Sequence, residues 1–150
     1  MSNTELKGRS ISRGVAEGEA MVTSEPLGFS HGLDPATGQI SESGHEWLGK
    51  CVKGKVLVFP YGKGSTTGGL YILEAAKRGN APIAVINLET DPVIAAGFII
   101  ADILYNKEIP VIDRLEQNPI ELIKTGDWVK VDANKGIIEI HHGKHQKLTI

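Results

Sequence analysis

The residues best suited to chemistry lie in one short loop, residues 62–69, which reads Gly-Lys-Gly-Ser-Thr-Thr-Gly-Gly. Its glycines tolerate positive φ and let a ligand approach the backbone closely. Its hydroxyl side chains belong to Ser65, Thr66 and Thr67. A hydroxyl becomes a useful base only when nearby N–H groups or a cation stabilise its alkoxide, and Lys63 would add positive charge. The loop therefore indicates an anion-binding or catalytic site.

The elements on either side predict that this loop leads into a helix. Residues 55–59 form a short apolar run typical of a buried strand, and Pro60 stops it. The three hydroxyl residues suit a helix start, and Gly79 is well placed to end the helix. A helix start leaves N–H groups unpaired and carries roughly half a positive charge, which favours a carboxylate or phosphate. The alternative is that the hydroxyls merely cap the helix.

The glycine spacing excludes two common nucleotide-binding motifs. The Walker motif, in which a glycine is followed by four residues and then by Gly-Lys-Ser/Thr, is absent. Gly62, Gly64 and Gly68 also lack the spacing of the dinucleotide-binding motif.

The remaining segments predict the rest of the fold. Buried strands at 82–87 and 109–112, with a helix beginning at Asp91-Pro92, imply a short parallel sheet. Antiparallel strands are expected from the ranges 6–12, 14–22, 127–132 and 136–140, with one or two helical turns at 119–124. The first two strands should pair with each other or with the last two. We therefore expect an α/β fold, a swivelling β/β/α domain with a small antiparallel or barrel-like sheet, a short parallel sheet and outer helices.

Residues 26–49 form a long segment without periodicity. Loops of this length in compact domains are usually functional or disordered. Asp34 precedes a proline in a turn sequence, so it either shapes the turn or contacts substrate. His31 and His45 are expected to be exposed loop histidines.

The totals limit the possible functions. One domain, residues 1–150, is expected, with a polar tail from about 141 that contains His141, His142 and His145. A frayed terminus is favoured there over a metal site. The net charge of −2 argues against nucleic-acid or membrane-surface binding. The single cysteine, Cys51, excludes an internal disulfide and an iron–sulfur cluster or thiolate zinc site held by this chain alone.

The chain is also expected to be cytoplasmic. Its N-terminus has no apolar signal core, and its longest apolar stretch, residues 93–103, is too short to span a bilayer.

Several segments together resemble one family, the small subunit of aconitase X-type dehydratases. The matching segments, which run in order through residues 6–140, are 32–40, 45–49, 54–60, 62–65, 81–82 and 109–111. The resemblance implies the swivelling domain of a two-subunit hydro-lyase, whose large subunit holds an iron or iron–sulfur centre. It also implies that this chain binds no cofactor itself.

The resemblance implies that Ser65 is the base that helps to dehydrate a β-hydroxy acid. Mevalonate 5-phosphate is the first choice of substrate and cis-3-hydroxy-L-proline the second. Lys63, Gly64, Thr66, Thr67 and Asp34 are then the candidate substrate-binding residues. Lys63 stands where the family would have arginine, so the bidentate fork of a strict anion clamp is missing.

Two other interpretations remain open. Residues 14–18 and the expected architecture also suit a phosphohistidine-type swivel domain, but residues 62–81 contain no histidine. The chain could also be a non-catalytic module that binds an anion at the loop or supports assembly of a larger subunit.

Overall fold

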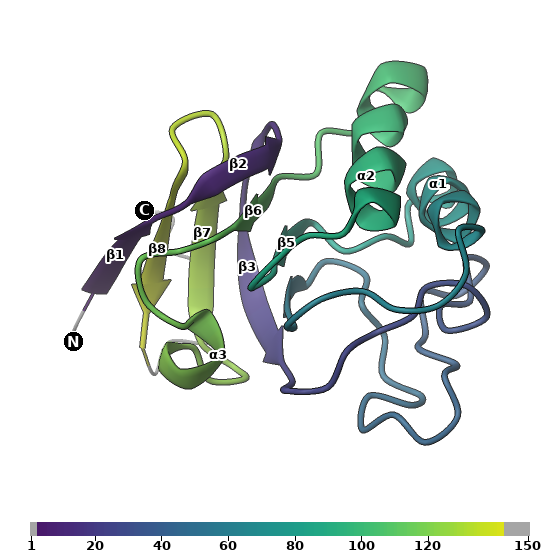
Figure 1. Ribbon diagram of the computed structural model, residues 1–150, viewed down its shortest axis with the longest axis horizontal. Coiled ribbons are helices and arrows are strands. Elements are labelled where there is room, and N and C mark those ends of the chain that lie inside the picture. Colours follow the sequence, from purple (N-terminus) through teal and green to yellow (C-terminus); the bar gives the residue numbers. More distant parts are fainter. Residues whose placement is uncertain (1–2, 143–150) are drawn as a thin grey trace.

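The computed structural model describes residues 3–142, which form eight strands and three helices. In chain order these are β1 (Asn3–Lys7), β2 (Arg9–Ser12), β3 (Val15–Val22), β4 (Val56–Val58), α1 (Gly68–Arg78), β5 (Ala84–Ile86), α2 (Pro92–Tyr105), β6 (Val111–Asp113), α3 (Pro119–Leu122), β7 (Trp128–Asp132) and β8 (Ile137–His141). Figure 1 shows β1, β7 and β8 on one side of the molecule and α1 and α2 on the opposite side.

The strands form one nearly closed sheet in the order β1-β8-β7-β3-β4-β5-β6-β2. The two edge strands, β1 and β2, are consecutive in the chain, so the segment that they form joins both edges of the sheet. Gly8 lies between them, and a Cβ there would be 2.7 Å from the Asp113 carbonyl oxygen. Only glycine fits this close approach, which lets the barrel-like sheet close.

Strand β3 connects the antiparallel and parallel parts of the sheet. Its residues 15–19 pair antiparallel with β7, and its residues 20–22 pair parallel with β4. Strands β4, β5 and β6 continue the parallel part. The expected mixed fold is therefore confirmed, and the first strands pair with the C-terminal ones rather than with each other.

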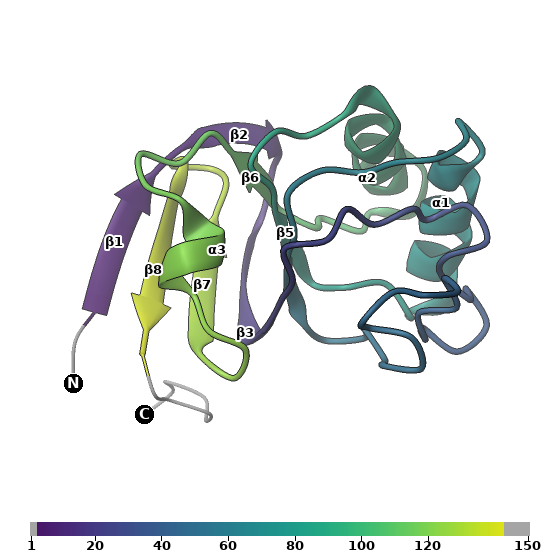
Figure 2. The ribbon, with the colours of Figure 1, turned by 60° about the horizontal axis from the view of Figure 1, so that its bottom comes forward.

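The sheet separates two hydrophobic cores. In β4, Val56 and Val58 face the barrel interior, while Leu57 belongs to the core under α1 and α2. Because the parallel strands are buried on both faces, their sequences are apolar throughout rather than alternating. Ile123, which follows α3, completes the barrel core, and α3 lies beside β7 and β8 in both views (Figures 1 and 2).

The long segment at 26–49 is an ordered part of the core under α1 and α2. It buries five large apolar side chains, those of Leu27, Phe29, Leu33, Ile40 and Trp47. Isolated bridges tie it to itself and to the loop after β4. Its apolar residues follow no helix or strand period, so their burial was not apparent from the sequence.

The helix boundaries agree well with the pattern of caps. Asp91 caps α2 by accepting a hydrogen bond from the Val93 N–H at 3.2 Å, and Pro92 takes the first helical position. Gly79 ends α1 in the left-handed conformation, with φ of 76°. Within the described part of the chain, no helix combines the length and apolar character needed to cross a membrane.

Two residues of the expected polar tail, His141 and His142, lie within the described part of the chain. His141 is the last residue of β8, and the His142 ring lies 3.3 Å from both the Asp127 carboxylate and the Thr4 hydroxyl. Strand β8 continues through His141 because β1 and β7 supply backbone hydrogen-bond partners on its two sides. His145 lies outside the described residues.

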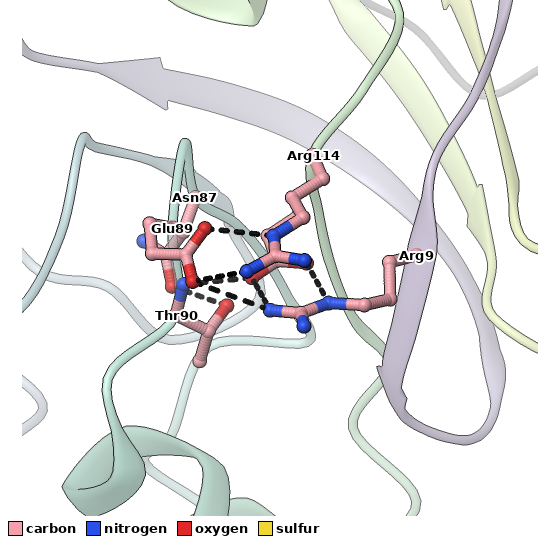
Figure 3. Close-up of polar contacts among 6 residues, drawn as sticks. Arg9, Asn87, Glu89, Thr90 and Arg114 are labelled. Carbon is pink, nitrogen blue, oxygen red and sulfur yellow. Dashed lines mark hydrogen bonds and ion pairs between the residues drawn. The ribbon is translucent and has the colours of Figure 1, made fainter.

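A network of two arginines and two carboxylates connects β2, the strand that closes the sheet, to the parallel strands (Figure 3). Arg9 of β2 makes a bidentate pair with the fully buried Asp113 of β6, at 2.9 and 2.8 Å. Thr90 donates its backbone N–H to the same carboxylate, and Arg114 pairs with Glu89, which lies 3.6 Å from Arg9. Burial alone would raise the pKa of Asp113, but the Arg9 and Thr90 hydrogen bonds lower it below the ordinary value.

Candidate active site

The hydroxyl loop lies at the carboxyl end of the central parallel strand β4, the edge where open α/β sheets present their sites. Backbone hydrogen bonds join Leu27 to Tyr61 at 3.2 Å and Lys63 to Leu27 at 3.1 Å. Gly62 packs against the capping carboxylate of Asp91, where a Cβ would lie 2.5 Å from Oδ1. Both neighbours of the loop, the 26–49 segment and the start of α2, therefore fix its position.

Ser65 is exposed, and its hydroxyl accepts two hydrogen bonds from Thr67. The Thr67 N–H donates at 3.2 Å and the Thr67 hydroxyl at 3.1 Å. Helix α1 begins at Gly68 with Thr67 as its N-cap residue, so the predicted start at the hydroxyl residues is confirmed, but the Thr67 side chain makes no capping bond. The Thr67 hydroxyl thus bonds to Ser65 instead of capping the helix.

Unpaired backbone donors surround this serine. Within the described residues, the N–H groups of Gly64, Ser65 and Thr66 donate no hydrogen bond to the protein. All three residues are exposed, and Gly64 adopts a φ of 94° that favours glycine. Free donors beside a helix N-terminus stabilise an anion, either a bound carboxylate or phosphate or a developing alkoxide.

A chain of hydroxyl groups leads away from Ser65 into the 26–49 segment. The Thr67 hydroxyl lies 2.6 Å from the Ser30 hydroxyl, which lies 3.3 Å from Nδ1 of His31. The His31 ring is 5.3 Å from the Tyr71 ring of α1, centroid to centroid. His31 is exposed, as expected, but neither it nor Ser30 was a predicted site residue. No local signal links Ser30 to Thr67, because they are 37 residues apart.

Lys63 is held by a carboxylate of the same chain. Its Nζ lies 2.7 Å from Oε2 of Glu42, and Glu42 also accepts the Gly28 N–H at 2.9 Å. Burial would raise the pKa of Glu42, but its hydrogen bonds with Lys63 and Gly28 lower it instead. The hydrogen bond to Glu42 in turn raises the pKa of Lys63. The Lys63 charge therefore anchors the loop, and its predicted contact with substrate stays a prediction.

Asp34 does not join the Ser65 cluster. Its carboxylate accepts the Ala36 N–H at 2.9 Å in an Asx turn, the structural role that the sequence left open. The next residue, Pro35, accepts a hydrogen bond at 2.8 Å from Asn80, which follows the C-terminal end of α1. Ser65 lies at the opposite end of that helix. A substrate contact by Asp34 remains a prediction.

His45 is buried, so the expectation of an exposed loop histidine was wrong. Its Nδ1 accepts the Trp47 N–H at 3.0 Å, and its ring packs 5.5 Å from the Trp47 ring. The aromatic neighbour and the turn, neither of which has a periodic signal, draw it into the core.

Helices α1 and α2 present an apolar surface next to the loop. A groove between them begins at Thr66 and passes Gly69, Val93 and Gly97. Exposed side chains continue this surface, which we call the α1–α2 apolar face: Leu70, Ile99, Ile100, Ile103 and Leu104. Leu70 is 65% exposed and Ile103 is 71% exposed. Large side chains at this exposure, grouped on neighbouring helices, are typical of a surface that a partner covers.

The fold and the site together define a class of protein. A nearly closed mixed sheet carries two helices on one face, and its hydroxyl loop leads into the first of them. This is the architecture of a swivelling domain that presents a polar loop to a neighbouring domain or subunit.

Comparison with known proteins identifies the family within this class. Residues 5–140 match the model of the aconitase X swivel domain. The chain is 48% identical over 143 residues to the phosphomevalonate dehydratase small subunit of Methanosarcina acetivorans, covering 95% of each protein. It is 43% identical over 136 residues to the protein of the same name from Methanocaldococcus jannaschii, covering 91% of this chain and 97% of that protein.

A solved structure supports the same assignment. The holo-form crystal structure of Thermococcus kodakaraensis aconitase X has a chain 42% identical to this one, with a TM-score of 0.82. The match covers 91% of this chain and 98% of that chain. The chain belongs to the aconitase X swivel domain family. Membership in this family favours the resemblance to aconitase X-type dehydratases over a phosphohistidine-type swivel domain.

Proposed function

We propose that this chain is the small subunit of a phosphomevalonate dehydratase, a two-subunit hydro-lyase, and that Ser65 is its base. The names of the similar proteins support mevalonate 5-phosphate over cis-3-hydroxy-L-proline as the substrate. The single observation that carries the role of Ser65 is its exposed hydroxyl, which accepts two hydrogen bonds beside free backbone donors.

The proposed chemistry is the removal of water from a β-hydroxy acid. A base takes the proton from the carbon next to the carboxylate, and the hydroxyl leaves from the following carbon. An alkoxide at Ser65 would be stabilised by the Thr67 N–H and hydroxyl and by the positive end of α1. When the Ser65 alkoxide takes the proton from the substrate carbon, it becomes the neutral hydroxyl again.

The second requirement is a Lewis acid for the leaving hydroxyl, which an iron or iron–sulfur centre of the large subunit would supply. Between residues 3 and 142 no group of three or more histidine, cysteine, aspartate or glutamate side chains could hold a metal ion. In this proposal the chain contributes the base and binds the substrate anion. Gly64, Thr66 and Lys63 are its proposed binding residues.

The large subunit must cover Ser65 for the two halves of the site to meet. We propose that it also covers the α1–α2 apolar face, because the groove of that face begins at Thr66, next to the base. Closure of such an interface would exclude water from the reacting atoms.

The test is Ser65→Ala in the assembled two-subunit enzyme. Removal of a general base costs about a hundred- to ten-thousand-fold in kcat, and we expect a loss of about a thousand-fold with little change in KM. The control is Ser43→Ala, because Ser43 is an exposed serine in the 26–49 segment with no side-chain hydrogen bond within the described residues.

Size-exclusion chromatography with the large subunit should show that both variants assemble like the parent. Turnover of the assembled Ser65→Ala enzyme within a few-fold of the parent would refute the role of Ser65. It would favour a non-catalytic assembly module.

A further inference from the structure

We propose that His31 draws the proton from Ser65 through the hydroxyls of Thr67 and Ser30 and so converts the serine into its basic form. This inference rests on the proposed function of Ser65. His31 acts through that serine and does not itself touch the substrate.

The four groups form one continuous path between two separate segments. The successive distances are 3.1 Å from Ser65 Oγ to Thr67 Oγ1, 2.6 Å to Ser30 Oγ and 3.3 Å to His31 Nδ1. The middle distance is short for two neutral hydroxyls, and the two outer distances are at the long end for hydrogen bonds. Each hydroxyl can donate one proton and accept another, which a relay requires.

The far end of the path is built with some conformational cost. His31 has a φ of 59°, a left-handed conformation that non-glycine residues adopt only rarely. The Ser41 hydroxyl donates to the His31 carbonyl at 3.0 Å, and the N–H groups of Gly32 and Leu33 both donate to the Phe29 carbonyl at 3.2 Å. The turn thereby aims the ring at Ser30, and Tyr71 supports it from α1.

The proton transfer balances. Ser65 gives its proton to Thr67, Thr67 gives its own proton to Ser30, and Ser30 gives its own to Nδ1 of a neutral His31. The products are a Ser65 alkoxide and a His31 imidazolium, and every hydrogen bond along the path now points toward Ser65. Because Thr67 donates to Ser65 in the structure, the transfer begins when both hydroxyls rotate so that Ser65 donates to Thr67, and it ends in the polarity that the structure has. The alkoxide then takes the substrate proton, and the exposed imidazolium releases its proton to water.

The surroundings of His31 make the proposal specific. Among the described residues, the ring hydrogen-bonds only with the Ser30 hydroxyl of its own segment and pairs only with the Tyr71 ring from α1. No carboxylate or ammonium group therefore competes with Ser30 for Nδ1 within residues 3–142.

The test is His31→Gly in the assembled enzyme, read out by chemical rescue. Glycine adopts the positive φ without strain, and removal of an exposed ring leaves room for added imidazole next to Ser30. We expect kcat to fall about ten- to a hundred-fold and added imidazole to restore it. The rescue should grow with pH as imidazole loses its proton. Ser30→Ala should lower kcat similarly but resist rescue.

Two controls separate the relay from its alternatives. Asn106→Gly makes the same backbone change at another left-handed residue, with φ of 55° at the end of α2, and should leave kcat unchanged. His31→Asn, which suits the same φ but cannot accept the relayed proton, should lose the parent's fall in kcat on the acid side. It serves as the main variant if His31→Gly fails to assemble.

The outcomes distinguish the two proposals. If Ser65→Ala is inactive while both His31 variants keep the parent's kcat and pH profile, the relay is wrong and the base stands. If the His31 variants lose activity but imidazole restores nothing and the acid limb persists, His31 is only structural and the relay is again wrong. An active Ser65→Ala overturns the proposed function and the relay together.

Discussion

At the scale of single residues, the site is defined by pairs that the chain brings together from distant positions. The Thr67 hydroxyl hydrogen-bonds with Ser30, and Lys63 forms an ion pair with Glu42. Both ends of the 62–69 loop are therefore held by the 26–49 segment. A loop rich in glycine has much conformational freedom to lose, and these contacts offset that entropy. The arrangement of Ser65 should therefore depend on residues outside the 62–69 loop.

The first prediction at this scale concerns Glu42→Gln. The variant loses the ion pair with Lys63, so the amides of Gly28 and Lys63 should exchange with solvent several-fold faster, as measured by hydrogen exchange. The pKa of Glu42 is lowered in the folded protein, so its stabilisation is present above about pH 4.3, the unfolded value, and is lost as the pH falls through the folded value. The difference between parent and variant should thus shrink in acid.

The control for this prediction is Glu121→Gln. Glu121 is an exposed acid in the first turn of α3, and its replacement should leave both amides unaffected. Unchanged exchange in Glu42→Gln at neutral pH would show that the ion pair does not hold the loop.

At the scale of elements, α2 is unusual because its outer face is as apolar as its inner face. Ile94, Phe98 and Ala101 are buried against the core, while Ile103 and Leu104 are 71% and 60% exposed. A helix that is apolar all round is normally buried. The α1–α2 apolar face is therefore the surface that we expect the large subunit to cover.

The second prediction tests this face with Ile103→Asp. A charge placed in a buried apolar interface costs several kcal/mol in association. We expect the dissociation constant for the large subunit, measured by titration calorimetry, to rise at least about a hundred-fold while the free subunit keeps its circular dichroism spectrum.

Leu48→Asp is the matched control, because Leu48 is 56% exposed and belongs to the 26–49 segment instead of the two helices. Unimpaired binding by Ile103→Asp would place the interface elsewhere.

At the scale of the whole molecule, closure of the sheet depends on the N-terminal strands, because β1 pairs with the C-terminal β8 and β2 pairs with β6. Arg9 on the closing strand and Asp113 on β6 connect the last pair of strands, and their network reaches Glu89 and Arg114 (Figure 3). If this junction opens, the barrel core is exposed along the edge. Its charges should therefore contribute to global stability and not only to local order.

The third prediction is that Asp113→Asn lowers the free energy of unfolding at neutral pH by about 1–3 kcal/mol, since charge-assisted hydrogen bonds are lost at a buried site. The pKa of Asp113 is lowered in the folded state, so its contribution is full above about pH 3.9, the unfolded value, and disappears as the pH falls through the folded value. Urea denaturation should show the two proteins converging in acid. An equal difference at every pH would mean that packing, and not ionisation, causes the loss.

The amino-acid sequence by itself determined most of the elements and the family. Alternating residues marked the β7–β8 hairpin, continuous apolar runs marked the strands that are buried on both faces, and Asp91-Pro92 and Gly79 marked helix ends. These signals are local, because periodicity and capping depend on neighbours within a few residues. The 62–69 loop was recognisable for the same reason, since its glycines and hydroxyls are contiguous.

Only the tertiary structure decided which distant residues meet. It placed β1 and β2 on opposite edges of one sheet, buried His45 and joined Ser30 and His31 to the Ser65 loop. These outcomes depend on contacts between segments far apart in the chain, for which neither residue carries a local pattern. Burial of the apolar side chains in the 26–49 segment selects them, because that burial fixes the segment against α1 and so sets the partners of its polar residues.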